Sequence, residues 1–166
     1  MKKISETFDP KIVEWRNFRD LECKAYKIDF DYTVLGYDIE KGKLDMMLRY
    51  PKGRGGCRRH RHIAATTTIV LKGEQHLTEL GKDGSKKEIK RKKGDYAVAQ
   101  ADALPHLEHG GDDGGIVLLS MQNDDGRLFE YFDENYENSW IVTVEDIVNS
   151  WNANEVYGSV PTKNVK

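Results

Sequence analysis

The sequence predicts an all-β domain, either a barrel or a sandwich, with a short helix near each end. Between about residues 26 and 121, short segments with β-branched or alternating apolar residues follow one another, separated by turns rich in Gly, Asp and Lys. No long segment in this region has a helical period, which argues against alternating strands and helices. With 166 residues, 38% of them hydrophobic, the chain can bury a core without disulfides.

The expected strands follow one another closely. Residues 25–40 alternate in part, residues 43–51 form an apolar run that meets a proline, and residues 65–71 are rich in β-branched side chains. Alternation and flanking turn residues predict further strands at 74–80, 87–90, 94–100 and 115–122. Tyr50, Tyr96, Met46 and Met47 also lie on these strands, and most of them are expected in the core, with the lining of an apolar pocket as the alternative.

Two short helices are expected outside this region. The segment TVEDIVNSWNA begins with a capping box, in which Thr143 is followed three residues later by Asp146. Apolar residues continue at helical spacing: Val144, Ile147, Val148 and Trp151. This helix is expected to pack on the barrel. A second short helix is expected within residues 9–21, DPKIVEWRNFRDL.

We expect a single domain over residues 1–166, with its core at roughly 26–122, an N-terminal strand or helix segment at 1–25, and a C-terminal strand and helix at 127–153. The net charge of -2 does not suit a nucleic-acid binder. No apolar stretch approaches the roughly 20 residues that span a membrane, and the opening MKKISETFDPK has no signal-peptide core. A cytoplasmic location without membrane partners is therefore expected.

The two cysteines predict neither a disulfide framework nor a zinc site, because Cys23 and Cys57 are isolated from each other and form no CxxC motif. Cys57 precedes the first histidines by only a few positions. A small, partly buried thiol is the expected state of Cys57.

All five histidines lie in the predicted β region: His60, His62, His76, His106 and His109. Side chains on a strand alternate between two faces, so His60 and His62 project from the same side and Arg61 from the other. Two imidazoles on one face can bind a single metal ion. Together with a later histidine in LPHLEH, the HxH pair predicts a three-imidazole metal site.

This ordered set resembles the two motifs of the cupin superfamily, the RmlC-like proteins, over roughly residues 45–122. The first family motif, G-x5-HxH-x(3,4)-E-x6-G, is matched by PKGRGGCRRHRHIAATTTIVLKG, with His60, His62 and Gly73 in the expected order. The second is matched by GDYAVAQADALPHLEH, which starts with a glycine and reaches His106 after a proline. The resemblance implies a cupin-type double-stranded β-helix, a jelly-roll barrel, with a metal ion inside.

The chain departs from these motifs in one chemically important way. The motif glutamate is absent, and Thr66, or Thr67 in the alternative register, stands in its place. A neutral hydroxyl is a poor ligand for a divalent metal. Three neutral imidazoles leave an iron(II) ion with its full double charge, which favours an anionic, chelating substrate such as the enolate of a β-diketone or hydroxyketone.

Among cupins, the three-histidine set resembles the acetylacetone-cleaving and dihydroxyacetophenone-type dioxygenases. The resemblance implies that His60, His62 and His106 bind non-haem Fe(II). Nickel, zinc, manganese and copper are alternatives, because histidine ligands bind several divalent metals. The resemblance also implies cleavage of a C–C bond by O2 in a small β-dicarbonyl or aryl ketone substrate. Small cupins often pair through sheet edges, so a homodimer or higher homo-oligomer is expected.

Two other functions use the same fold. A metallo-cupin isomerase or lyase would employ the metal as a Lewis acid without O2, and a cupin binding module would sense a ligand. The fold by itself does not rank the three.

Glu108 follows His106 by two residues, so both point into the barrel if this segment is a strand. Glu108 is the candidate catalytic residue, with three roles open: a fourth metal ligand, an acceptor from a ligand imidazole, or a general base; the alternative is a carboxylate at the rim. Either Gln75 or His76 is a candidate to line the pocket, because the two alternate on one strand. His109 has the opposite parity and is expected outside.

Overall fold

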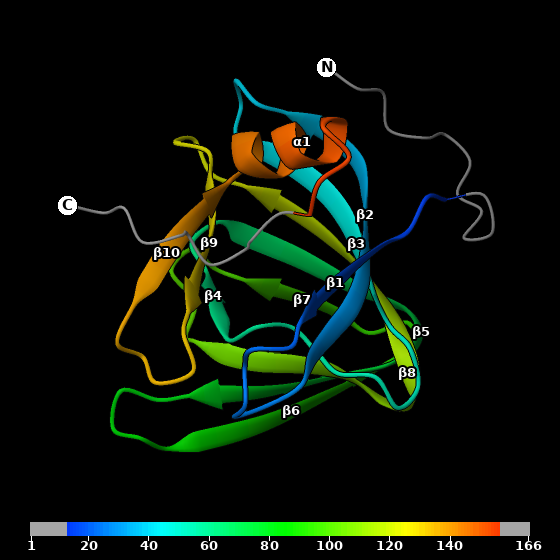
Figure 1. Cartoon of the computed structure of the whole chain (residues 1–166), viewed down its shortest axis with the longest axis vertical. Coiled ribbons are helices and arrows are strands. Elements are labelled where there is room, and N and C mark those ends of the chain that lie inside the picture. The colour runs from blue at the N-terminus through cyan, green and yellow to red at the C-terminus, as the bar shows by residue number, and fades with distance from the viewer. Residues whose placement is uncertain (1–12, 157–166) are drawn as a thin grey trace.

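The computed structural model describes residues 13–156, which form ten strands and one helix (Figure 1). In chain order these are β1 (Arg16–Asp20), β2 (Ile28–Asp38), β3 (Lys43–Tyr50), β4 (His60–His62), β5 (Ala65–Leu80), β6 (Lys86–Lys92), β7 (Tyr96–Ala99), β8 (His106–Gln122), β9 (Arg127–Phe132), β10 (Ser139–Thr143) and α1 (Val144–Asn152). The predicted all-β fold and its C-terminal helix are confirmed.

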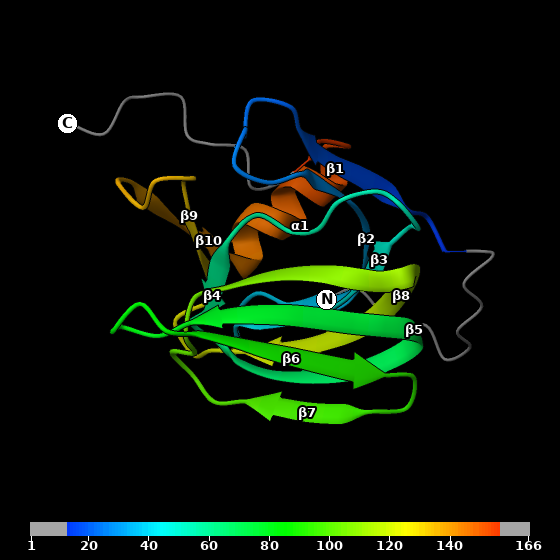
Figure 2. The same ribbon diagram turned by 90° about the horizontal axis from the view of Figure 1, so that it is seen from below.

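The strands form one curled antiparallel sheet in the order β1-β2-β3-β8-β4-β9-β10, and β5 pairs with β6, β7 and β8. The two longest strands, β5 and β8, pair with each other over most of their length. Figure 2 shows β5, β6 and β7 as one layer, with β1 and α1 on the opposite side of the molecule. Because β8 also pairs with β3 and β4, it connects the two layers.

A bulge near Gly73 bends β5, and the register against β8 shifts on both sides of it. Gly73 has φ of +63°, and a Cβ atom there would lie 2.2 Å from the carbonyl oxygen of Gly114, so only glycine fits. The bulge also changes which residues face inward. Before it, even-numbered side chains such as Thr68 are buried, and after it, odd-numbered side chains such as Gln75 are buried.

Helix α1 begins at a complete capping box, as predicted. The Thr143 side chain accepts a hydrogen bond from the Asp146 backbone, and the Asp146 carboxylate accepts from the Thr143 backbone N–H. The four apolar residues named above are buried, and the Trp151 ring lies edge-on to Tyr32 of β2 at 5.7 Å. Among the described residues, no helix is long and apolar enough to cross a membrane.

The predicted N-terminal helix is wrong where the structure can test it. Residues 9–12 lie outside the described part of the chain, but Arg16–Asp20 form strand β1, paired with β2. The Phe18 ring stacks on Phe30 with centroids 5.1 Å apart. Pairing with the backbone of β2 and burial of one aromatic ring together override a local helical spacing.

Tyr96 is a second wrong expectation, because 66% of it is exposed, whereas Tyr50, Met46 and Met47 are buried as expected. Tyr96 starts the short strand β7, whose alternate residue Ala97 is half-buried. The strand therefore turns its small side chains inward and its large ones to the solvent.

Candidate metal centre

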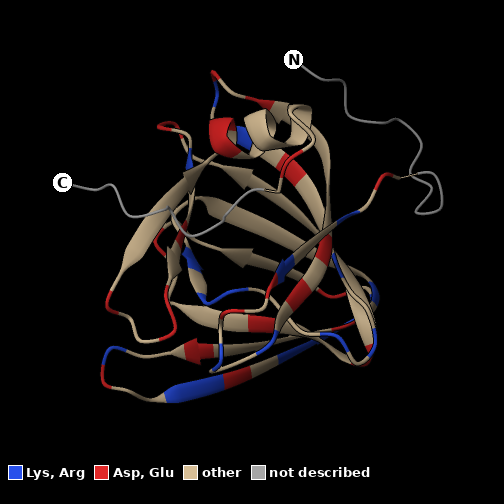
Figure 3. Cartoon of the chain, in the orientation of Figure 1, with Lys and Arg blue, Asp and Glu red and all other residues tan. Residues whose placement is uncertain are grey.

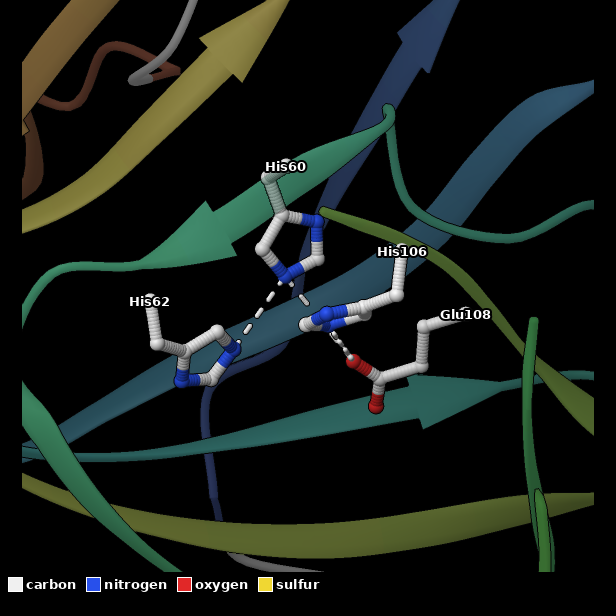
Figure 4. A group of neighbouring side chains, drawn as sticks. All are labelled: His60, His62, His106 and Glu108. Atoms are coloured by element: carbon white, nitrogen blue, oxygen red, sulfur yellow. Dashed lines mark hydrogen bonds and ion pairs between the residues drawn. The ribbon is translucent and has the colours of Figure 1, made fainter. Parts of the chain in front are cut away.

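Four buried side chains from two strands converge inside the barrel. His60 and His62 extend from β4, and His106 and Glu108 extend from the start of β8 (Figure 4). His60 and His106 are directly paired across the antiparallel ladder, and each of the four residues is at most 5% exposed. Arg61, between the first two histidines, points the other way and pairs with Glu130 of β9. The alternation predicted from the sequence holds in both segments.

The three imidazoles are close enough to share an ion. Nε2 of His60 lies 3.2 Å from Nε2 of His62, and the His106 ring centroid lies 4.5 Å from that of His60 and 5.3 Å from that of His62. Two nitrogens each about 2.1 Å from a metal ion are about 3.0 Å apart at a right angle and about 3.4 Å apart at the tetrahedral angle. The observed Nε2 separation falls between these values.

Each imidazole has an oxygen acceptor at Nδ1. Nδ1 of His60 lies 2.7 Å from the Arg58 carbonyl oxygen, and Nδ1 of His106 lies 3.1 Å from the Leu104 carbonyl oxygen. Carbonyl oxygens only accept, so both Nδ1 atoms carry the proton, which leaves a lone pair on each Nε2.

The Thr66 hydroxyl is the acceptor for Nδ1–H of His62. It donates to the Ala64 carbonyl at 3.0 Å, so its oxygen accepts from Nδ1 of His62, 2.7 Å away. The three partners thus orient all three rings with their Nε2 lone pairs available for a metal, an arrangement typical of metal-binding histidines.

The donor set fits a divalent transition metal. Nε2 of His106 is buried without a hydrogen-bond partner, and the two other Nε2 lone pairs face each other. Burial, with His106 nearby, lowers the pKa of His60 from 6.5 to about 3, and burial with the neighbouring His60 and His106 lowers the pKa of His62 well below 6.5. Neutral imidazoles facing one point satisfy their lone pairs by binding a cation.

Glu108 is held beside the histidines by a chain of hydrogen bonds. Its Oε1 accepts from Nε2 of Gln75 at 2.6 Å, and Oε1 of Gln75 accepts from Nη1 of Arg91 at 2.8 Å. Because an arginine can only donate, this contact fixes the orientation of the Gln75 amide. The other carboxylate oxygen, Oε2, lies 3.8 Å from Nε2 of His106 and 4.0 Å from Nε2 of His60. Glu108 is therefore not a partner of any Nδ1–H.

Between the two candidates on β5, Gln75 faces the site and His76 does not. Gln75 is 1% exposed, whereas Nε2 of His76 contacts Glu74 at 2.8 Å on the other face of the strand. The exposed His109 lies outside as expected, with its ring 5.2 Å from that of His76. Cys57 is buried and its Sγ lies 3.2 Å from the Tyr50 hydroxyl.

Two groups at the site are not predicted from the sequence. Arg91 belongs to a lysine-rich hairpin whose composition predicts a solvated segment, and only its inward position on β6 distinguishes it from its neighbours. The Phe129 ring of β9 stands edge-on to the rings of His60 and His62, with centroids 5.6 and 5.1 Å away. No motif near Phe129 indicated this position, because β9 and β4 become neighbours only through sheet pairing.

A small cavity of about 40 Å³ adjoins the centre. Its buried wall contains His62, His106 and Glu108, while half-buried residues of β6 and β7 complete the lining. The other lining residues are Thr66, Thr68, Gln75, Leu77, Glu79, Arg91, Ala97, Ala99 and Ala103. A ligand larger than a few water-sized groups would therefore extend from this space past the half-buried residues toward the solvent.

An antiparallel jelly roll with these side chains on its inward faces has the cupin fold, which confirms the resemblance at the level of the fold. No model of a known protein family and no curated protein matches the sequence. Solved structures do match. The acetylacetone dioxygenase of Acinetobacter johnsonii has a TM-score of 0.63 at 16% identity, covering 93% of this chain and 97% of that one.

Two further solved structures show the same fold. A protein of Methylibium petroleiphilum PM1, provisionally assigned as an acetylacetone dioxygenase, has a TM-score of 0.61 at 17% identity, covering 91% of this chain and 97% of that one. The iron(II) form of HppE has a TM-score of 0.51 at 13% identity, covering 72% of this chain and 62% of that one. At these identities the similarity is one of fold.

Proposed function

We propose that this protein is a non-haem iron(II) dioxygenase that cleaves a C–C bond in a small β-dicarbonyl. One observation carries the proposal: three imidazole Nε2 atoms, each on a ring whose Nδ1–H is already bonded to an oxygen, face a single buried point. Iron(II) held by these three histidines would supply a site at which an enolate substrate reacts with dioxygen, with the enolate as the net source of electrons. His60, His62 and His106 are the proposed ligands.

The chain's own groups prepare the substrate. Glu108 is the proposed general base, because Oε2 faces the same point as the histidines and can accept the acidic proton from the carbon between two carbonyls. Gln75 donates to Oε1 and so keeps Oε2 directed at the substrate. Removal of that proton leaves an enolate, the anionic chelating form that a site of three neutral imidazoles favours.

The cavity adjoins the histidines, so a small substrate bound at the centre would extend into it. A β-dicarbonyl is the first candidate, because its enolate supplies the negative charge that three neutral imidazoles lack, and an aryl ketone is the alternative. Two of the structures with the same fold are named as acetylacetone dioxygenases, one of them provisionally, and a third is an iron(II) protein. These names support iron and a β-dicarbonyl as the first choices to test.

The decisive experiment is oxygen uptake. Protein purified without an affinity tag is loaded with iron(II) under argon and mixed with acetylacetone and other β-diketones in an oxygen electrode. We expect one bound metal per chain and oxygen consumption in step with loss of diketone. The His106→Ala variant should lose both metal and uptake, whereas His109→Ala, an exposed histidine on the same strand, should retain both.

The competing functions predict a different result. A metallo-isomerase or lyase would use the same carboxylate and the same ion without oxygen, and a sensing module would only bind its ligand. An iron-loaded protein that consumes no oxygen with any diketone overturns the dioxygenase proposal. Uptake that persists in His106→Ala overturns the proposed ligand set.

A further inference from the structure

One unpaired cation lines the cavity beside the metal centre. Arg91 of β6 is half-buried there, and within residues 13–156 its guanidinium makes one hydrogen bond, to Oε1 of Gln75, and no ion pair. A guanidinium has five N–H donors, so four remain for another partner. Figure 3 shows the basic residues gathered along β6, but Lys90 and Lys92, on either side of Arg91, are exposed on the outer face.

Arg91 lies toward the mouth of the cavity. The histidines, Glu108 and Gln75 are buried, whereas Arg91 and the small residues of β7 are half-buried and therefore closer to solvent. The other charged residue at the mouth is Glu79, whose carboxylate has its own partner, Nζ of Lys87 at 3.9 Å. A ligand that extends outward from the metal centre would therefore contact the Arg91 guanidinium, the charged group of the mouth that has no ion-pair partner among the described residues.

The charge balance calls for a second anionic group. A divalent ion and the Arg91 guanidinium contribute three positive charges. Glu108 and a neutral diketone together contribute one negative charge, because the proton that leaves the diketone passes to Glu108, and the Glu79 carboxylate is paired with Lys87. The remaining positive charge is unfavourable where the effective dielectric constant is low, and a carboxylate on the substrate reduces it.

We propose that Arg91 recognises a carboxylate on the substrate, so that the substrate is a 1,3-dicarbonyl acid, such as a 2,4-dioxo acid, and not a neutral diketone. The dicarbonyl end would lie at the metal centre and the carboxylate at the mouth. The planar guanidinium suits a carboxylate because two parallel N–H groups can bind its two oxygens. This inference rests on the proposed function and specifies its substrate class.

The test compares two ligands with the same dicarbonyl unit. Acetylacetone ends in a methyl group where 2,4-dioxopentanoate has a carboxylate. Zinc-loaded protein, which supports no oxygen chemistry, is titrated with each ligand by calorimetry. We expect the unmodified protein to bind 2,4-dioxopentanoate at least ten-fold more tightly than acetylacetone. In Arg91→Gln the affinity for 2,4-dioxopentanoate should fall roughly 10- to 100-fold, whereas the affinity for acetylacetone should change less than two-fold.

The control variant is Lys90→Gln, which removes the same charge from the neighbouring position on the outer face and should leave both affinities unchanged. Zinc content and the midpoint of thermal unfolding confirm that each variant is folded and loaded with zinc.

An equal loss of affinity for both ligands in Arg91→Gln would mean that Arg91 acts only by positioning Gln75 and Glu108, which overturns the recognition role. Equal binding of both ligands by the unmodified protein overturns the inference and leaves the proposed function standing. If neither ligand binds the zinc-loaded protein, both are overturned.

Discussion

The hydroxyl oxygen of Thr66 lies 2.7 Å from Nδ1 of His62. Thr66 is one of the two threonines that align with the glutamate of the cupin motif. Thr66 therefore acts on the metal centre through a histidine and not as a ligand. The carboxylate of the site comes instead from Glu108 on another strand, at the other end of the pairing between β5 and β8. The candidate centre thus combines three imidazoles with a carboxylate whose Oε2 lies 3.8 Å from Nε2 of His106 and 4.0 Å from Nε2 of His60.

Replacing Thr66 with Val tests the link to His62. Valine has a similar shape but cannot accept the Nδ1–H, so His62 loses the partner that fixes its tautomer, and zinc affinity should fall roughly 10- to 100-fold. Thr66→Ser should retain the affinity. Competition with a chromophoric chelator measures it, and Thr67→Val on the opposite face of β5 is the matched control. Unchanged zinc binding in Thr66→Val would contradict this role.

Replacing Glu108 with Gln tests the proposed base. The amide oxygen can still accept from Gln75, so the fold and the metal content should be preserved. The amide cannot take a proton from the substrate, and kcat should fall by roughly 10²- to 10⁴-fold. Glu79→Gln, at the mouth of the same cavity, is the control for a lost charge. If Glu108→Gln loses its metal as completely as His106→Ala, Glu108 is a ligand and not the base.

The stability of the metal-free protein should fall with decreasing pH. Burial lowers the native-state pKa of His60 from 6.5 to about 3, and that of His62 also lies well below 6.5. Below about pH 6.5 the unfolded chain takes up protons that the native state does not, so the free energy of unfolding decreases by about 1.4 kcal/mol per pH unit for each such proton. This contribution is fully present above pH 6.5 and decreases as the pH falls toward 3.

Urea unfolding in the presence of a chelator, measured between pH 7 and about pH 4.5, checks this slope. In His60→Gln the slope of the free energy of unfolding against pH should decrease by the contribution of about one proton. In His109→Gln, which removes an exposed histidine, the slope should not change. Equal slopes for the unmodified protein and His60→Gln would mean that His60 is not buried in its neutral form.

The capping box of α1 should contribute measurably to stability. Asp146→Ala removes the acceptor for the Thr143 backbone N–H and should lower the free energy of unfolding by about 1 kcal/mol. Asn149→Ala, at an exposed position of the same helix, should change it little. Urea unfolding at pH 7 compares the two, and an Asp146→Ala midpoint equal to that of the control would contradict the role of the cap.

Much of the candidate site followed from alternation alone. One residue separates His60 from His62, and one separates His106 from Glu108. Both segments are regular strands, so each pair faces inward as expected. The same rule did not choose between Gln75 and His76, because the bulge at Gly73 reverses the inward parity of β5. Alternation also did not predict that Arg91 faces inward, because Arg91 lies in a run of lysines and no neighbouring residue marks the inward face of that strand.

The sequence by itself determined the all-β class, the C-terminal helix with its cap and the histidine set, because periodicity and capping are properties of neighbouring residues. Only the tertiary structure decided that residues 16–20 form a strand, that Gln75 supports Glu108 and that Arg91 lines the cavity. These features depend on the register between strands far apart in the chain. That register results from the pairing and packing of the whole barrel, and no short segment encodes it.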